Sequence, residues 1–212
     1  MPENSGYVTV SEYGVDEFVE KKSRFIGYAR PVSDADEAME FVKEIKKKHN
    51  DARHNCFAYS LKDGSLRYSD DGEPQGTAGQ PILDVLVRSG VTDCVVVVTR
   101  YFGGVLLGTG GLTRAYTEGA KIAINAAKPV EMIKAKLVAF NCDYSIYGSI
   151  QTLLAKHGAT IDNSDFQEDI HLEILVLPSD FKSLCDDICE LSAGKIIITE
   201  KSEKFLKKSA LI

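Results

Sequence analysis

The sequence has no apolar run that approaches the roughly 20 residues a membrane-spanning helix needs, because glycine or arginine interrupts its longest apolar stretches. Its first ten residues, MPENSGYVTV, lack the basic and apolar regions of an export signal. These two absences predict a cytoplasmic protein with no membrane segment. The 212 residues suffice for one large domain or two small ones, and 44% hydrophobic and 26% charged residues are typical of a soluble globular chain.

Cysteine is scarce, with five residues that cannot all pair in disulfides. Most lie within apolar patterns, and Cys185 and Cys189 are four residues apart on the apolar stripe of a predicted helix. A zinc site would need further ligands at suitable spacing, and the neighbouring sequence supplies none. We therefore predict buried free thiols, no metal site and no cofactor.

Positive charge is not in excess. The chain has 25 basic and 31 acidic residues, for a net charge of −6. Non-specific nucleic-acid binding depends mostly on neutralising phosphates, so this balance argues against a broad nucleic-acid surface. A local basic groove remains compatible with it.

The predicted N-terminal part begins with strand-like segments, which are followed by a helix. Ser33 is the expected N-cap of a helix whose apolar face repeats at helical spacing through Ala38, Phe41, Val42 and Ile45. Four consecutive valines, Val95–Val98, indicate a strand buried on both faces. Strands are expected at about 7–13, 15–20, 25–32, 56–61, 66–69 and 95–98, with helices at about 33–48, 82–88 and 112–127.

The pattern changes between residues 128 and 136, where Pro129 ends the preceding helix. Strands are then expected at 138–144, 160–163, 170–176 and 196–200, with helices around 150–157 and 179–191. This order is β-α-β-β-α-β, the ferredoxin-like pattern. We predict an α+β protein with two domains, residues 1–134 and 135–212.

A glycine-rich stretch from Arg100 to Arg114 carries the first candidate site. A buried strand that leads through glycines into a helix leaves backbone N–H groups free to bind phosphate or carboxylate, and Arg100 and Arg114 could point at the same anion. The spacing from Gly103 to Thr109 matches a P-loop without its lysine, and the glycines could instead serve only tight packing. The candidate ligand-binding residues are Arg100, Tyr101, Gly103, Gly104, Gly108, Thr109, Gly110, Gly111, Thr113 and Arg114.

The polar segment Ser69–Pro81 is the second candidate, a facing wall for the first. Its acidic residues could bind a metal or form a solvated turn around Gly72, but they lack the ligand count of a hard-metal loop. Its glutamine and threonine side chains are suited to lining a groove. The residues assigned to this facing side are Arg53, His54, Asp70, Asp71, Glu73, Gln75 and Thr77.

His54 and Cys56 are two apart on a predicted strand and therefore share one face. A cysteine nucleophile is conceivable there. The strand context instead predicts a buried, unactivated thiol, so no catalytic residue is assigned.

Four segments in order resemble the IMPACT/YigZ family. They are KKSRFIGYA (21–29), DARHNCFAY (51–59), SDDGEPQGTAGQPIL (69–83) and VVVVTRYFGGVLLGTGGLTRAY (95–116). The resemblance extends over the first 127 residues. The remainder is similar to the ferredoxin-like domain that accompanies bacterial members.

This resemblance implies an N-terminal α/β sandwich of the type shared by ribosomal small-subunit proteins, elongation factor G and GHMP kinases. Eukaryotic members act by protein binding and restrain amino-acid-starvation signalling to translation initiation, with a different second domain. We therefore expect a non-catalytic regulatory module linked to translation. It would bind RNA or the ribosome, a nucleotide or a partner protein through the glycine-rich groove.

The alternative is a phosphoryl-transfer enzyme that uses the glycine-rich segment as a phosphate cradle, as GHMP kinases do. It would need a metal-holding acid and a base, which only Asp70, Asp71 or Glu73 could supply. Either function predicts that phosphate or sulfate binds at Gly108–Leu112.

Overall fold

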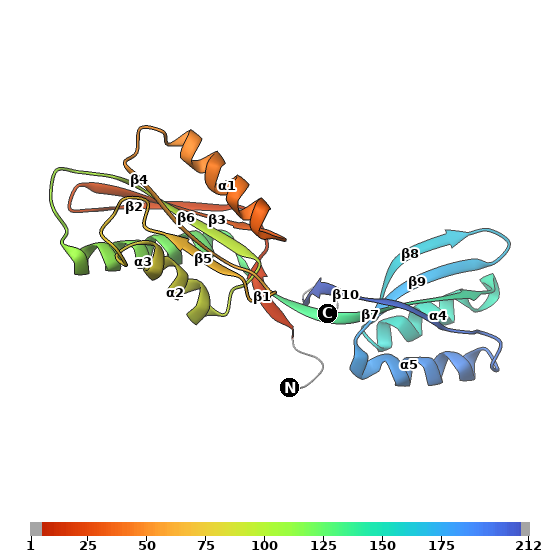
Figure 1. Ribbon diagram of the computed structural model, residues 1–212. Helices are drawn as coiled ribbons and strands as arrows, with labels where there is room; N and C mark the ends of the chain where they lie inside the picture. The colour runs from red at the N-terminus through yellow and green to blue at the C-terminus, as the bar shows by residue number, and fades with distance from the viewer. Residues whose placement is uncertain (1–5, 209–212) are drawn as a thin grey trace. The chain divides into compact units, whose positions relative to one another are not determined.

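The chain forms two compact units, one of Tyr7–Val130 and one that begins at Glu131 (Figure 1). The computed structural model describes residues 6–208. The division falls four residues before the predicted boundary between 134 and 135. Across residues 6–208, no helix is both long and apolar enough to span a bilayer.

A five-stranded antiparallel sheet in the order β2-β3-β6-β4-β5 forms the centre of the N-terminal unit. Helix α1 packs on one face, and helices α2 and α3 pack on the other (Figure 1). The elements are β1 (Tyr7–Val10), β2 (Gly14–Glu20), β3 (Ser23–Pro31), α1 (Ala35–Lys48), β4 (His54–Ser60), β5 (Leu66–Ser69), α2 (Gly79–Ser89), β6 (Cys94–Tyr101) and α3 (Thr109–Ala126). The predicted sandwich of helices around a sheet is confirmed.

The central strand β6 has apolar side chains on both faces, so helices must cover both faces of the sheet. Val95 and Val97 belong to the core beneath α1, whereas Val96 and Val98 belong to the core beneath α2 and α3. All four valines are fully buried, as the unbroken apolar run predicts.

The start of α1 differs from the prediction by one residue. Asp34, not Ser33, is the N-cap, and its carboxylate accepts a hydrogen bond of 2.8 Å from the Glu37 backbone N–H. The Ser33 N–H instead donates to the Glu37 carboxylate. The two bonds resemble a capping box, except that the Glu37 carboxylate accepts from the residue before the N-cap.

The C-terminal unit has a four-stranded antiparallel ladder in the order β10-β7-β9-β8. Helices α4 and α5 pack through Ile150, Leu154, Leu184 and Ile188 onto the same core. The elements are β7 (Pro129–Cys142), α4 (Tyr144–Lys156), β8 (Thr160–Phe166), β9 (Ile170–Val176), α5 (Pro178–Leu191) and β10 (Thr199–Lys207). This is the predicted ferredoxin-like topology.

Two predictions for this unit were wrong in detail. The last strand starts at Thr199 and runs to Lys207, rather than spanning 196–200. Cys189 is exposed and Cys185 half-buried, because α5 turns Leu184 and Ile188 to the core. The predicted burial holds for Cys56, Cys94 and Cys142.

Candidate functional site

The candidate site begins where three neighbouring strands end. Phe25 of β3, Arg100 of β6 and His54 of β4 are aligned across the sheet by strand register. Phe25 belongs to the core beneath α2 and α3, and the Arg100 guanidinium lies 5.6 Å from the centre of its ring. Arg100 and His54 therefore both face the layer formed by α2 and α3.

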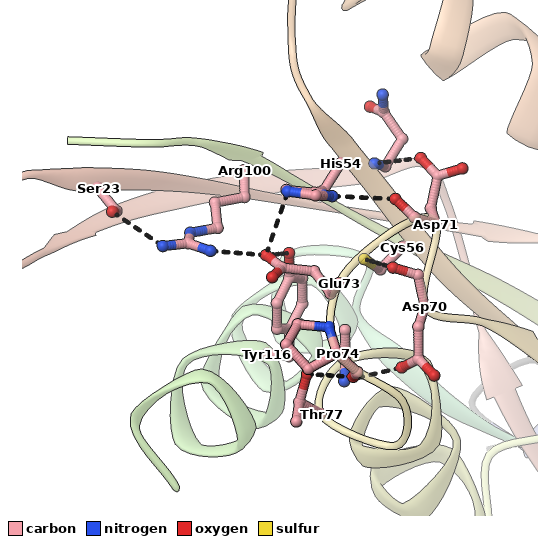
Figure 2. Close-up of polar contacts among 12 residues, drawn as sticks. Ser23, His54, Cys56, Asp70, Asp71, Glu73, Pro74, Thr77, Arg100 and Tyr116 are labelled. Carbon is pink, nitrogen blue, oxygen red and sulfur yellow. Dashed lines mark hydrogen bonds and ion pairs between the residues drawn. The ribbon is translucent and has the colours of Figure 1, made fainter. Parts of the chain in front are cut away.

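Arg100 forms a buried ion pair with Glu73 (Figure 2). Its Nη1 lies 2.7 Å from Glu73 Oε1, which also accepts a 2.8 Å hydrogen bond from the Tyr116 hydroxyl. Arg100 is 5% exposed and Glu73 8%. The guanidinium is thus directed at Glu73, in contrast to the predicted approach to an external anion.

The rest of the Arg100 guanidinium is only partly satisfied. Nη2 lies 3.5 Å from the Ser23 hydroxyl, and Nε is buried without a hydrogen-bond acceptor among the described residues. Burying two charges is costly unless their remaining hydrogen-bonding groups are also paired. The pair is therefore sensitive to loss of either partner.

His54 lies beside this pair. The Asp71 carbonyl can only accept a hydrogen bond, so His54 Nδ1, 3.0 Å away, carries a proton. Nε2 then faces Glu73 Oε1 at 3.9 Å, and an ion pair forms only when the ring is doubly protonated. The imidazole thus joins the segment after β5 to the end of the sheet.

The carboxylates of Asp70 and Asp71 are engaged inside the fold. Asp70 accepts hydrogen bonds from three backbone N–H groups at the start of α2, and Asp71 binds Lys46 at 2.5 Å and the Asn55 N–H at 2.7 Å. In the portion of the chain described, no three His, Cys, Asp or Glu side chains are grouped so as to hold a metal ion. These acids are structural rather than groove-lining.

Thr77 and Gln75, two further residues of the segment Ser69–Pro81, differ in burial. Thr77 is buried, and its hydroxyl donates a 2.6 Å hydrogen bond to the Pro74 carbonyl. Gln75 is exposed. Because Glu73 binds Arg100 directly, the segment Ser69–Pro81 is packed against the end of β6 rather than placed across an open groove.

Cys56 shares a face with His54, as predicted, and its side chain is fully buried. Its thiol donates to the Asp70 carbonyl at 2.9 Å. Burial raises the pKa of this thiol well above its usual range. The thiolate needed for nucleophilic attack is therefore disfavoured.

The glycine-rich segment is attached to the turn between β2 and β3. The Gly103 N–H donates to the Ser23 hydroxyl at 3.2 Å, and a Cβ at Gly103 would collide with the Lys22 backbone. Gly104 and Gly108 adopt φ angles of +83° and +72°, which other L-residues rarely adopt. The glycines therefore serve a close chain approach and two left-handed positions.

Replacing Gly103 by alanine should displace the segment, because the collision involves backbone atoms that cannot rotate away. Gly110 is the matched control, since a Cβ there would meet only the flexible end of Arg114, at 3.6 Å. We expect Gly103→Ala to lower the unfolding midpoint and Gly110→Ala to leave it unchanged or raise it. Urea unfolding followed by circular dichroism measures both, and equal midpoints for the two variants would contradict the packing role.

Helix α3 begins three residues earlier than predicted, at Thr109, and Gly108 at its N-cap provides no side-chain acceptor. Within the described residues, the N–H groups of Thr109, Gly110 and Gly111 have no hydrogen-bond acceptor. Further along α3, Thr113 is half-buried and Arg114 is exposed. Of the predicted amides, those of Thr109, Gly110 and Gly111 are therefore available to a ligand, whereas the Leu112 N–H donates to the Gly108 carbonyl at 2.9 Å.

A groove of about 360 Å³ lies between α3 and the β2–β3 turn. Phe18, Leu107 and Ala115 give it apolar walls, and Gly111 also lines it. Its charged lining residues are Glu20, Lys21, Arg114 and Glu118. The chain segment across this groove from α3 is therefore the β2–β3 turn, not Ser69–Pro81.

Four exposed cations lie near this end of the sheet without an ion-pair partner among the described residues. Lys21 and Arg114 line the groove, Lys22 contacts Gly103, and Arg53 precedes His54. By contrast, Arg24, Lys46 and Arg100 are all paired with carboxylates. The free positive charge of this region therefore comes from residues that surround the groove and the strand ends.

Tyr101 points to the opposite face of the sheet from Arg100 and ends a chain of hydrogen bonds. Its hydroxyl donates to Asp51 at 2.8 Å, so it accepts from His49 Nδ1 at 2.8 Å. In the neutral imidazole, His49 Nε2 then accepts from the Tyr28 hydroxyl at 2.6 Å. Burial, with a smaller effect of Lys48, lowers the pKa of His49. Burial therefore favours the neutral imidazole in this hydrogen-bond network.

This preference for the neutral imidazole predicts a pH-dependent stability. The unfolded state binds a proton on His49 below about pH 6.5, whereas the folded state with its lowered pKa does so only at lower pH. The stabilisation is complete above the unfolded pKa and decreases as the pH falls below it, by at most about 1.4 kcal/mol per pH unit.

Urea unfolding at pH ~7.5 and ~5.5 tests this linkage. His49→Gln should show a smaller difference in unfolding free energy between the two pH values than the wild type. His171→Gln in the C-terminal unit is the control and should retain the wild-type difference. Equal differences in all three proteins would rule out His49 as the source.

Comparison with known proteins assigns the two units separately. Residues 21–124 match the Impact N-terminal domain, and residues 140–195 match a domain of unknown function, DUF1949. IMPACT family member YvyE of Bacillus subtilis is 38% identical over 205 residues, covering 96% of this chain and 94% of the relative. The chain belongs to the IMPACT family.

Other members give the same assignment. IMPACT family member YigZ of Escherichia coli is 36% identical over 180 residues, covering 83% of this chain and 88% of the relative. A Protein IMPACT homolog of Dictyostelium discoideum is 36% identical over 95 residues, which are 42% of this chain and 27% of that protein. A crystal structure described as a hypothetical protein superposes with a TM-score of 0.59 at 31% identity, covering 93% of this chain and 98% of that one.

The four segments that carry the IMPACT resemblance meet in the buried network. They contribute Ser23, His54, Glu73, Arg100 and Tyr116, which lie together in Figure 2. Sequence reasoning assigned no functional role to Ser23 or Tyr116. The signal available was their position inside the quoted segments, since neither residue type has a distinctive spacing.

Proposed function

We propose that this IMPACT family protein is a non-catalytic binding module linked to translation, which holds an anionic partner at the glycine-rich end of its N-terminal unit. RNA, a nucleotide and a protein are the candidate partners. The link to translation rests on the resemblance to eukaryotic members that act on translation initiation. The anionic character of the partner rests on the site itself.

The unpaired cations around the start of α3 carry this proposal. A surface cation without an ion-pair partner is common. Here, however, Lys21 and Arg114 line the same groove as Gly111, whose N–H has no acceptor within the described residues. The helix dipole adds partial positive charge at this terminus. Glu20 and Glu118 oppose it in part, so binding should be moderate and salt-sensitive.

Phosphoryl transfer is not proposed, because the acids it requires are already engaged. Glu73 is held by Arg100 and Tyr116, and the carboxylates of Asp70 and Asp71 bind backbone N–H groups and Lys46. Recruiting any of them as a base or metal ligand would leave these partners unpaired. The glycine-rich segment therefore supports binding rather than catalysis.

Charge reversal at Arg114 tests the proposal. Fluorescence anisotropy with a labelled single-stranded RNA of about 12 nucleotides, and thermal-shift assays with ATP, ADP and phosphate, report the affinity of the full chain. We expect Arg114→Glu to weaken binding of whichever anion binds by about ten-fold and to lower its salt dependence.

Arg88→Glu is the matched control, since Arg88 is an exposed arginine on α2 without an ion pair among the described residues. It should bind like the wild type. Equal affinities for Arg114→Glu and Arg88→Glu would show that the start of α3 is not the binding site.

A further inference from the structure

The glycine-rich segment also exposes a group of apolar side chains. Leu106 is 82% exposed, and Phe102 and Val105 are also exposed. A single exposed apolar residue is ordinary at a protein surface. Three within five consecutive residues, next in sequence to the groove-lining Leu107, are a local concentration of exposed apolar side chains, which is typical of interaction sites.

The segment is built to hold this apolar tip outward. Leu107, the residue after Leu106, is buried in the core beneath α2 and α3. It packs so closely on Gly111 that a Cβ there would lie 2.9 Å from the Leu107 Cβ. Because Leu107 anchors the chain inward, Leu106 is directed to solvent next to the groove that Leu107 lines.

The charges around this apolar surface favour an acidic partner. Lys21 and Arg114 line the groove, and Lys22 lies against Gly103 on the same turn as Lys21. None of the three has an ion-pair partner within the described part of the chain. Glu20 and Glu118 offset two of these charges, which leaves one positive side chain in excess.

A protein segment fits these features better than a nucleic acid. Single-stranded nucleic acids are held by continuous basic grooves and by aromatic stacking, whereas the most exposed residue here is aliphatic and two glutamates line the groove. A peptide with carboxylates beside a bulky apolar side chain would complement both the cations and the apolar surface.

Resting on the proposed function, we propose that the partner held at this site is a protein. Its contacting segment carries a bulky apolar side chain flanked by aspartate or glutamate. The apolar side chain packs against Leu106 and enters the groove lined by Phe18, Leu107 and Ala115. The flanking carboxylates pair with Lys21, Lys22 and Arg114.

Selection from a random dodecapeptide display library on the full-length protein tests this partner chemistry. We expect the enriched peptides to combine acidic residues with Leu, Ile, Met or Phe. Their affinity, measured by fluorescence anisotropy on synthetic copies, should fall at least ten-fold in Leu106→Ser and in Arg114→Gln. Ile197→Ser and Arg88→Gln are the controls, because Ile197 is also 82% exposed and Arg88 is an unpaired surface arginine among the described residues. Both controls should bind like the wild type.

The same proteins are assayed with the labelled single-stranded RNA. Enriched peptides that are basic, or that bind Leu106→Ser as well as wild type, would overturn the partner assignment. If RNA binds in an Arg114-dependent manner and no acidic apolar peptide is enriched, the assignment to a protein is wrong while the proposed function stands. If neither probe binds, and ATP, ADP and phosphate also leave the melting temperature unchanged, both are wrong.

Discussion

Replacing Arg100 by methionine is expected to lower the free energy of unfolding of the N-terminal unit by about 3–5 kcal/mol, the usual effect of removing one partner from a buried ion pair. Methionine preserves much of the side-chain volume, so the loss reports mainly the uncompensated Glu73 carboxylate. Glu73 would keep its hydrogen bond from Tyr116 but would have no cation nearer than His54. Urea unfolding followed by circular dichroism measures the change, and tyrosine fluorescence provides a second probe because the chain has no tryptophan.

Two further variants distinguish the effect of breaking the Arg100–Glu73 ion pair from the effect of removing any arginine. Arg114→Met removes an exposed arginine from the same unit and should change stability little. Glu73→Gln combined with Arg100→Met removes both charges while leaving an acceptor for Tyr116, and should recover at least half of the loss. If Arg100→Met were as stable as Arg114→Met, the ion pair would not hold the end of the sheet together.

The fold was predictable from the sequence wherever local periodicity matches burial. The valines of β6 and the apolar face of α1 predict a strand and a helix correctly, because the spacing of their apolar residues follows directly from which side chains are buried. The starts of α3 and β10 were not predictable in this way. The TGG sequence at Thr109–Gly111 has low helix propensity, and the exposed residues of β10 follow a register set by pairing with β7.

At the site, the shared strand face of neighbouring residues was predictable, but the contacts between distant segments were not. His54 and Cys56 share a face because strand side chains alternate, which is a local rule. Glu73 and Arg100 are 27 residues apart, and only the packing of the segment after β5 on the sheet brings them together. Arg100 was therefore expected at an external anion, when an internal carboxylate already occupies its guanidinium.

Asp70→Ala is expected to destabilise the N-terminal unit by about 2–4 kcal/mol, because buried backbone N–H groups at the start of α2 would lose an ionised acceptor. Asp70 Oδ1 accepts from the Ala78 and Gly79 N–H groups at 3.0 and 2.8 Å, and Oδ2 accepts from the Gly76 N–H at 2.8 Å. Ala78 and Gly79 are buried, so water cannot readily replace the carboxylate at their N–H groups. The Asp70 carbonyl also accepts from Cys56, so the same residue ties β4 to the start of α2.

The position of an aspartate in a turn does not by itself account for such a loss. Asp63 also lies in a turn and accepts one hydrogen bond from the Ser65 N–H, but at an exposed site. Asp63→Ala should therefore change the unfolding free energy little, and Asp70→Asn should fall between wild type and Asp70→Ala because its amide keeps one acceptor oxygen. Equal losses for Asp63→Ala and Asp70→Ala would mean that turn propensity explains both. The predicted order, with Asp70→Ala much the least stable, would establish that the acidic segment is retained for the architecture of α2 rather than for a metal or a base.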